Sequence, residues 1–125
     1  MKTARLFTSL GSILLVISAA FHTSGYPRLL QLMQKNAITW PASGILKASW
    51  LTFSILLFAL AVIAFLARNM ERGGPLVLIA AAANVACAVI LWRFLGFFAG
   101  VYLLTAVTVF LTIGGWLQLK DKPLI

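Results

Sequence analysis

The chain has 125 residues, of which 62% are hydrophobic and 10% are charged, and its mean hydropathy is +1.05. Because a soluble domain is about half apolar and about one quarter charged, this composition excludes a soluble globular domain or a disordered chain and predicts an integral membrane protein. The formal net charge is +8, but the ten Lys and Arg residues are scattered singly or in pairs, so we expect lipid contacts and no nucleic-acid partner.

Four stretches of the sequence carry no charged residue, and each is long enough to cross a bilayer once. They cover residues 6–27, 48–67, 73–92 and 94–119. A helix rises 1.5 Å per residue, so about 20 residues cross a hydrocarbon core of roughly 30 Å. The sequence therefore predicts a single all-α domain over residues 1–125, an integral membrane four-helix bundle with spans at about 6–23, 47–67, 75–93 and 97–117.

The first of these spans also resembles a secretory signal peptide. Lys2 and Arg5 precede an apolar stretch that ends in the small residues Ser18, Ala19 and Ala20. Cleavage after Ala20 would leave three spans. We favour an uncleaved first helix, because the three later spans already commit the chain to the membrane, and the cleaved alternative stays open.

The first external loop, residues 24–46, is the one loop of appreciable length, and it contains an amphipathic pattern. From Pro27 onward, the apolar residues fall mainly on one side of a helix and the polar ones on the other. This pattern predicts a short interfacial helix that lies in the plane of the membrane surface. Tyr26, Trp40 and Trp50 would then lie at head-group depth. An irregular loop folded over the bundle is the alternative, since Pro27 and Pro41 both fall in this segment.

The third span begins with Pro75 after two glycines, and a tight turn at Gly96 separates it from the fourth. Orientation follows from the Lys and Arg residues that flank the spans. The two termini and the loop at residues 68–72 together carry six of them, and the opposite side carries four, which are Arg28, Lys35, Lys47 and Arg93. We therefore predict a protein of the inner (plasma) membrane with both termini in the cytoplasm.

The residues that membrane enzymes and pumps require are mostly absent from the predicted spans. Glu71 and Asp121 both lie outside them, which argues against a proton-coupled exporter. One cysteine, Cys87, cannot support quinone-linked disulfide exchange, and we expect it to be a packing residue. One histidine, His22, cannot hold a haem between two imidazoles unless the chain dimerises. We expect no cofactor, no metal site and no enzymatic activity.

The first span runs into Phe21-His22-Thr23-Ser24-Gly25-Tyr26-Pro27. Together with the length and the four helices with short loops, this segment resembles small bacterial inner-membrane proteins of the DoxX-like and uncharacterised kind. The resemblance covers the whole chain, is architectural and rests on no diagnostic motif. The acidic residues of a redox-linked subunit are missing from the spans, so no functional residue is carried over.

The sequence predicts a non-enzymatic multi-pass protein that is a small subunit of a membrane complex or associates with itself. Small residues let helices approach closely in lipid, and several are spaced along one helix face. These are Ala82 with Ala86, Ala83 with Cys87, and Gly11 with Ser18. The alternative is a carrier or binder of a lipid-like or anionic small molecule at the outer face. An enzyme that uses His22 is the third possibility.

Five residues form the predicted site at the outer face: His22, Tyr26, Arg28, Lys47 and Arg93. The topology places His22, Lys47 and Arg93 near one membrane depth, with Arg28 within two turns of His22, on the side opposite to both acidic residues. Basic side chains in such a position either reach separately to lipid phosphates or share one anion. Separate lipid contacts are the simpler interpretation, and the sharper hypothesis is an outward-facing pocket for a lipid head group or an anionic substrate, roofed by residues 27–38.

A second group of polar residues lies in the middle of the last two spans. Burying the amide of Asn84 in hydrocarbon without a partner costs several kcal/mol, so we expect it to point into the bundle. Thr105, Thr108 and Thr112 form a polar stripe at a similar depth on the fourth span. We predict a hydrogen bond from Asn84 to Thr108 or Thr105 that stabilises packing, with Ser54 and Ser12 as second choices.

Overall fold

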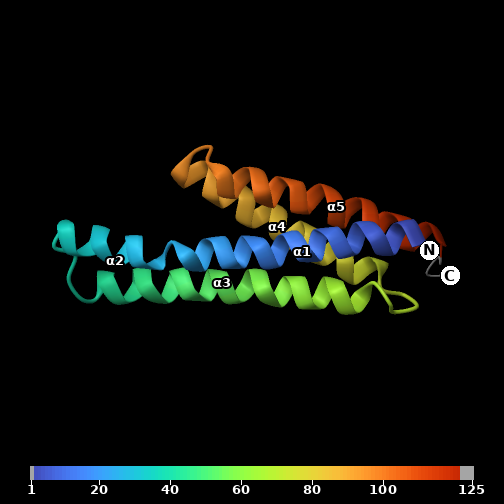
Figure 1. The fold of residues 1–125 in the computed structure, drawn as a ribbon, viewed down its shortest axis with the longest axis horizontal. Coiled ribbons are helices and arrows are strands. Elements are labelled where there is room, and N and C mark those ends of the chain that lie inside the picture. The colour runs from blue at the N-terminus through green and yellow to red at the C-terminus, as the bar shows by residue number, and fades with distance from the viewer. Residues whose placement is uncertain (1, 122–125) are drawn as a thin grey trace.

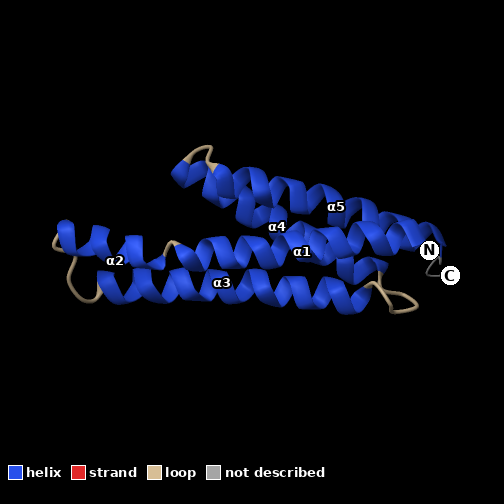
Figure 2. Ribbon diagram, viewed as in Figure 1, coloured by secondary structure: helices blue, strands red, loops and turns tan. Residues whose placement is uncertain are grey.

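The computed structural model describes residues 2–121, which form five helices joined by short loops (Figure 1). The helices are α1 (Lys2–Ser24), α2 (Tyr26–Lys35), α3 (Ala42–Ala67), α4 (Gly74–Leu95) and α5 (Ala99–Asp121). No strand occurs within this part of the chain (Figure 2). The long helices alternate in direction, so that the start of α1, the α3–α4 loop and the end of α5 meet at one end of the bundle (Figure 1).

Four helical segments are long and apolar enough to cross a membrane, as the sequence predicts. They are α1 together with α2, then α3, α4 and α5. Each predicted span lies largely within its helix, but α3 begins at residue 42 and not at 47, and α5 continues to residue 121. The difference arises because charged residues end an apolar stretch but do not end a helix, whereas Pro41 stands directly before α3. Lys122, one of the basic residues used to predict orientation, lies outside the described residues.

The first loop contains a helix, α2, but this helix continues the direction of α1 (Figure 1). Pro27 occupies its first turn, where the missing N–H removes no hydrogen bond. Gly25, between the two helices, lies so close to the indole of Trp50 that a Cβ atom on it would stand 2.8 Å from Cζ2 of that ring. This contact fixes the α1–α2 junction against α3, and α2 continues past the level of the α4–α5 tip, so residues 27–38 do not cover that tip (Figure 1).

α1 is the central helix, because it packs against α3 on one side and α5 on the other, and α4 packs mainly on α5. Glycines permit the closest approaches. A Cβ atom at Gly114 of α5 would stand 2.8 Å from the backbone nitrogen of Thr8, and one at Gly11 of α1 would stand 2.5 Å from Leu111. Gly74 of α4 and Gly115 of α5 meet in the same way, with 3.0 Å from a Cβ at Gly74 to the Gly115 carbonyl oxygen. All of these contacts lie toward one end of the bundle.

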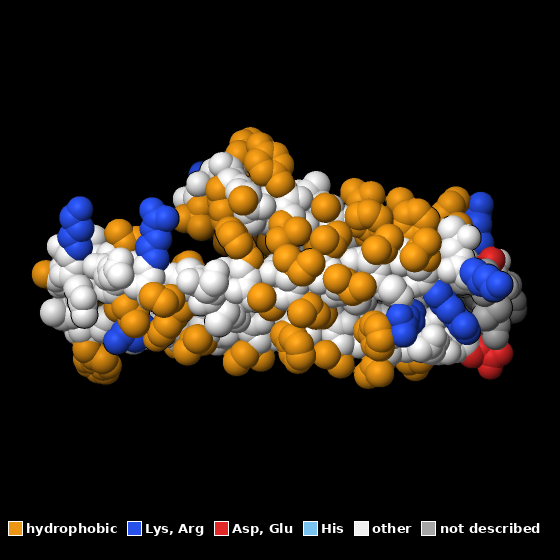
Figure 3. All heavy atoms as spheres, in the orientation of Figure 1, with side chains coloured by type: hydrophobic (Ala, Val, Ile, Leu, Met, Phe, Trp, Pro, Cys, Tyr) orange, Lys and Arg blue, Asp and Glu red, His pale blue; other side chains and the backbone are white. Residues whose placement is uncertain are grey.

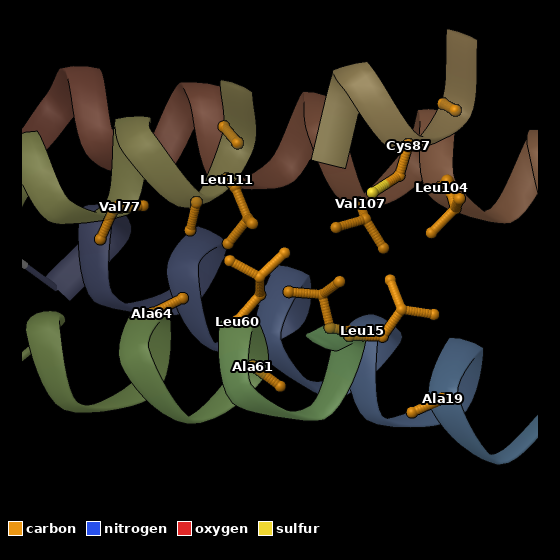
Figure 4. Close-up of a cluster of buried hydrophobic side chains, with 14 of the residues drawn as sticks. Leu15, Ala19, Leu60, Ala61, Ala64, Val77, Cys87, Leu104, Val107 and Leu111 are labelled. Carbon is orange, nitrogen blue, oxygen red and sulfur yellow. The ribbon is translucent and has the colours of Figure 1, made fainter. Parts of the chain in front are cut away.

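The core between the helices is built from alanine and a few larger aliphatic side chains (Figure 4). The largest buried ones are Leu15, Leu57, Val77, Leu104, Val107 and Leu111. Large apolar side chains also cover the outside, and Figure 3 shows them along the length of the helices, with charged side chains at the two ends. Ile55 and Ile79, for example, are 68% and 64% exposed.

The two ends of the bundle differ in packing. We call the end formed by the start of α1, the α3–α4 loop and the end of α5 the closed end. The open end is formed by α2, the start of α3 and the α4–α5 turn. Toward the open end the α4–α5 hairpin diverges from α1 and stops short of α2, and a hollow separates its tip from α1 (Figures 1 and 3).

Candidate functional site

His22 joins α1 to α3 at the start of the open end. Its Nδ1 lies 2.9 Å from the hydroxyl oxygen of Ser54, and its ring stacks on Trp50 with 4.2 Å between ring centroids. Phe53 contacts the same ring at a centroid distance of 4.8 Å. The indole Nε1 of Trp50 donates a hydrogen bond of 2.9 Å to the backbone oxygen of His22. These contacts make His22 part of the interface between two helices.

The hydroxyl of Ser54 has two acceptors within reach. It lies 3.3 Å from the backbone oxygen of Trp50 and 2.9 Å from Nδ1 of His22. If the hydroxyl donates to the carbonyl, Nδ1 carries the proton and donates to the hydroxyl; if it donates to the ring, Nδ1 accepts. Ser54 is 8% exposed, so either arrangement satisfies a buried polar group.

Lys47, Arg28 and Arg93 all belong to the open end of the bundle. Because Trp50 pairs with His22, Lys47 stands one turn closer to the open end, beside the α1–α2 junction. Arg28 is in the first turn of α2, and Arg93 is in the last turn of α4. The α4–α5 tip reaches about the same level along the bundle as that junction but stands apart from it (Figure 1).

These three basic side chains are exposed, and Tyr26 at the junction is half-buried. Within residues 2–121, none of the three forms a hydrogen bond or an ion pair with another residue. The structure therefore brings them to one level without joining them, and His22 is set apart by its contacts with α3. Since the chain has two acidic residues, and both Glu71 and Asp121 are at the closed end, no carboxylate side chain neutralises the open end.

The hollow at the open end follows from the divergence of α5 from α1. At the closed half, Phe7 of α1 packs on Phe110 of α5 with 5.9 Å between ring centroids. Phe21 lies on the same face of α1, two heptads further on, and is 50% exposed. Ala99, three turns before Phe110 on the same face of α5, stands near its level and is exposed. The face of α1 that α5 covers in the closed half of the bundle is thus uncovered at the open end.

The tip of the α4–α5 hairpin is aromatic. Trp92 contacts Phe97 at a centroid distance of 5.5 Å, and Phe97 contacts Tyr102 at 6.1 Å. Gly96 makes the turn with a φ of 74°, which a residue with a side chain rarely adopts. Rings of this kind favour head-group depth in a bilayer, so the tip has the composition of an interfacial segment.

Asn84 of α4 makes the hydrogen bond that the sequence predicts. Its Nδ2 donates to the hydroxyl of Thr108 at 2.7 Å and to the backbone oxygen of Leu104 at 2.7 Å. Thr105 instead donates to a carbonyl oxygen of its own helix, and so does Ser12 on α1. The side chain of Asn84 is fully buried, so its amide connects α4 and α5 inside the bundle.

The orientation of this amide is fixed by its partners. A backbone oxygen can only accept, and the Thr108 hydroxyl itself donates to the oxygen of Leu104, so both positions require a donor from Asn84. The Oδ1 atom is consequently left without a hydrogen bond among the described residues. Asn84 satisfies its donors and not its acceptor, which limits what this contact contributes to stability.

The closed end contains a polar network that the sequence reasoning missed. Gln118 donates to the hydroxyl of Thr8 at 3.1 Å, and Arg68 donates to Ser9 at 2.6 Å. The guanidinium of Arg68 also lies 3.6 Å from the centroid of the Phe65 ring. A cavity of about 120 Å³ lies between these elements, lined by Ala4, Arg5, Arg68, Asn69, Met70, Glu71, Gln118 and Asp121. The one feature of the sequence that could have indicated this network is the presence of polar residues near the ends of apolar helices.

No group of three or more His, Cys, Asp or Glu residues that could hold a metal ion occurs within residues 2–121. Cys87 is buried in the core, as a packing residue would be. Comparison of the chain with models of protein families, with curated proteins and with solved structures found no match.

Proposed function

We propose that this chain is a non-enzymatic multi-pass membrane protein that acts as a small subunit of a membrane complex or associates with itself. The observation that carries the proposal is the distribution of side chains: apolar residues cover the length of the bundle and charged residues lie at its ends (Figure 3). In water this surface would be costly, whereas in a bilayer it matches the solvent. The architectural resemblance to DoxX-like proteins is consistent with it.

Self-association would use the exposed face of α4. Ala82 and Ala86 are both exposed and are spaced so that a second helix could approach closely, with Ile79 on the same face. Of the other small residues noted in the sequence, Gly11, Ser18 and Cys87 are buried within the chain and Ala83 is partly buried against its core. They are occupied by contacts between its own helices.

The assembly test is native mass spectrometry of the protein purified in a mild detergent. We expect a mass of at least two copies, or a fixed partner, and we expect Ala82→Leu to dissociate a homo-oligomer by blocking close approach. Ala59→Leu is the matched control, because Ala59 is an exposed alanine on α3. A monomer with no bound protein would contradict the proposal.

We propose further that the closed end faces the cytoplasm of the inner membrane, with both termini inside. Basic residues are more numerous near that end, as the positive-inside rule requires. Lys35 at the end of α2 is exposed, so a Lys35→Cys protein should react with a membrane-impermeant thiol reagent in intact cells. Reaction only after lysis would reverse the topology.

The second candidate function is the binding of an anionic lipid at the open end. It is favoured by the exposed basic residues at one level and by the placement of both acidic residues at the opposite end. Such clusters attract anionic head groups. The wild-type protein should therefore retain phosphatidylglycerol in preference to phosphatidylcholine in native mass spectrometry, and equal retention of the two would remove this candidate.

A further inference from the structure

We infer that the hollow at the open end is a groove for one acyl chain of an anionic glycerophospholipid whose phosphate is bound by Arg93 and Arg28. This inference rests on the second candidate function and assigns it a place and a ligand geometry. Three observations support it: the uncovered face of α1, the basic residues at the level of the tip, and the aromatic composition of the tip.

The shape of the hollow suits a hydrocarbon chain. Phe21 and Ala99 lie on the faces of α1 and α5 that meet further along the bundle, and both are exposed where the helices diverge. In a bilayer, a space between two apolar helix faces that is left empty forfeits dispersion contacts on both sides. An acyl chain restores these contacts. The opening of the hollow to the side of the bundle admits such a chain directly from the lipid phase (Figure 3).

The head group would be bound at the mouth of the hollow. Arg93 ends α4 on the hairpin side, and basic side chains of α2 rise on the side of the bundle where the tip stands (Figure 3). A guanidinium group binds two phosphate oxygens through a planar pair of N–H groups. Because no Asp or Glu of the chain lies at this end, no carboxylate competes with a phosphate for Arg93 or Arg28.

Lys47 lies at the same level but belongs to a different side of the molecule. It is on α3, and α1 stands between α3 and α5. We therefore leave Lys47 out of the groove, although it contributes positive charge to the open end. This separation provides a matched control, since Lys47→Gln removes the same charge at the same level without touching the groove.

The head-group test uses native mass spectrometry with dioleoyl phosphatidylglycerol as the probe and dioleoyl phosphatidylcholine as the neutral comparison. Arg93→Gln and Arg28→Gln should each weaken phosphatidylglycerol binding about tenfold, as expected for loss of a charge-assisted pair of hydrogen bonds. Lys47→Gln should change it by less than about twofold. Equal losses in all three variants would show diffuse attraction by net charge and would overturn the inference.

The acyl-chain test uses a substitution whose larger side chain would occupy the groove. Ala99→Trp places a large ring on the α5 face of the hollow and should weaken binding of phosphatidylglycerol, whereas Val109→Trp should not, because Val109 is an exposed residue on another face of α5. Thermal unfolding of both variants checks that the bundle is intact. Undiminished binding by a folded Ala99→Trp protein would overturn the groove, and so would competition by free glycerol 3-phosphate as effective as that by the lipid.

The outcomes separate this inference from the functions on which it builds. If the wild-type protein does not prefer phosphatidylglycerol, the second candidate function fails together with the groove. If it prefers phosphatidylglycerol but the Arg93 and Arg28 variants bind it equally well, only the assigned site fails. If Ala99→Trp instead dissociates a homo-oligomer, a second copy of the chain occupies the hollow and the inference is overturned.

Discussion

The closed and open ends of this bundle are built by different means. At the closed end, backbones approach closely at Gly114 and Gly74, and side-chain hydrogen bonds from Gln118 and Arg68 cross between helices. At the open end, the α1–α3 pair is held by the stacking of His22 on Trp50, and the α4–α5 hairpin stands apart (Figure 1). Close backbone packing therefore fixes one end, and the other end is less closely packed.

This difference has a simple physical origin. Helices in a bilayer gain little from the hydrophobic effect, so they associate where small residues let backbones touch and where polar groups find partners. Both kinds of residue occur where α1 crosses α5 near the closed end, at Thr8 and Gly114. Toward the tip of the α4–α5 hairpin no such contact joins α5 to α1, and the helices separate (Figure 1).

The largest expected effect comes from Gly114→Ala at the closed end. The new Cβ would meet the backbone of Thr8 at 2.8 Å, and backbone cannot move aside as a flexible side chain can. We expect a loss of about 1–3 kcal/mol in the free energy of unfolding, measured by denaturation in detergent. Gly44→Ala is the control, because its Cβ would meet only the Trp40 ring at 3.6 Å. Equal stability of the two variants would contradict the close approach at Gly114.

A smaller effect is expected from Asn84→Leu, midway between the ends. The substitution removes two hydrogen bonds to α5 but also removes a buried oxygen without a partner. Interhelical bonds of this kind average about 0.6 kcal/mol, so we expect a loss of about 1 kcal/mol in unfolding free energy. Thr105→Val, which breaks only a bond within α5, should cost less. Unchanged stability and self-association of Asn84→Leu would refute a packing role.

The smallest effect is expected from Trp50→Phe at the open end. Phenylalanine keeps a ring beside His22 but loses the 2.9 Å hydrogen bond to its backbone oxygen. We expect the free energy of unfolding to fall by less than about 1 kcal/mol. Relative to the wild-type protein, hydrogen exchange should become faster in α2 and change less in α5. Faster exchange spread evenly over all helices would show that the two ends are not independent and would break the comparison.

Part of the candidate site was accessible from the sequence because it depends on depth alone. Antiparallel helices joined by short loops place Arg28, Lys47 and Arg93 near one level, and the same reasoning matches Asn84 with Thr108. Depth does not give the angle between helices. The sequence therefore did not show that α2 continues along α1 and that the hairpin tip diverges from both, so that residues 27–38 do not lie over the tip (Figure 1).

The sequence by itself determined four apolar helices, their approximate bounds and the placement of both acidic residues at one end, because hydropathy and helix length act locally along the chain. Only the tertiary structure decided which helix is central, that His22 is engaged by Ser54 and Trp50, and that one end is closed and the other open. These features depend on where glycines of distant segments, such as Gly11 and Gly114, let two backbones meet. No local pattern encodes that pairing, because it is fixed by the steric fit of both partners at once.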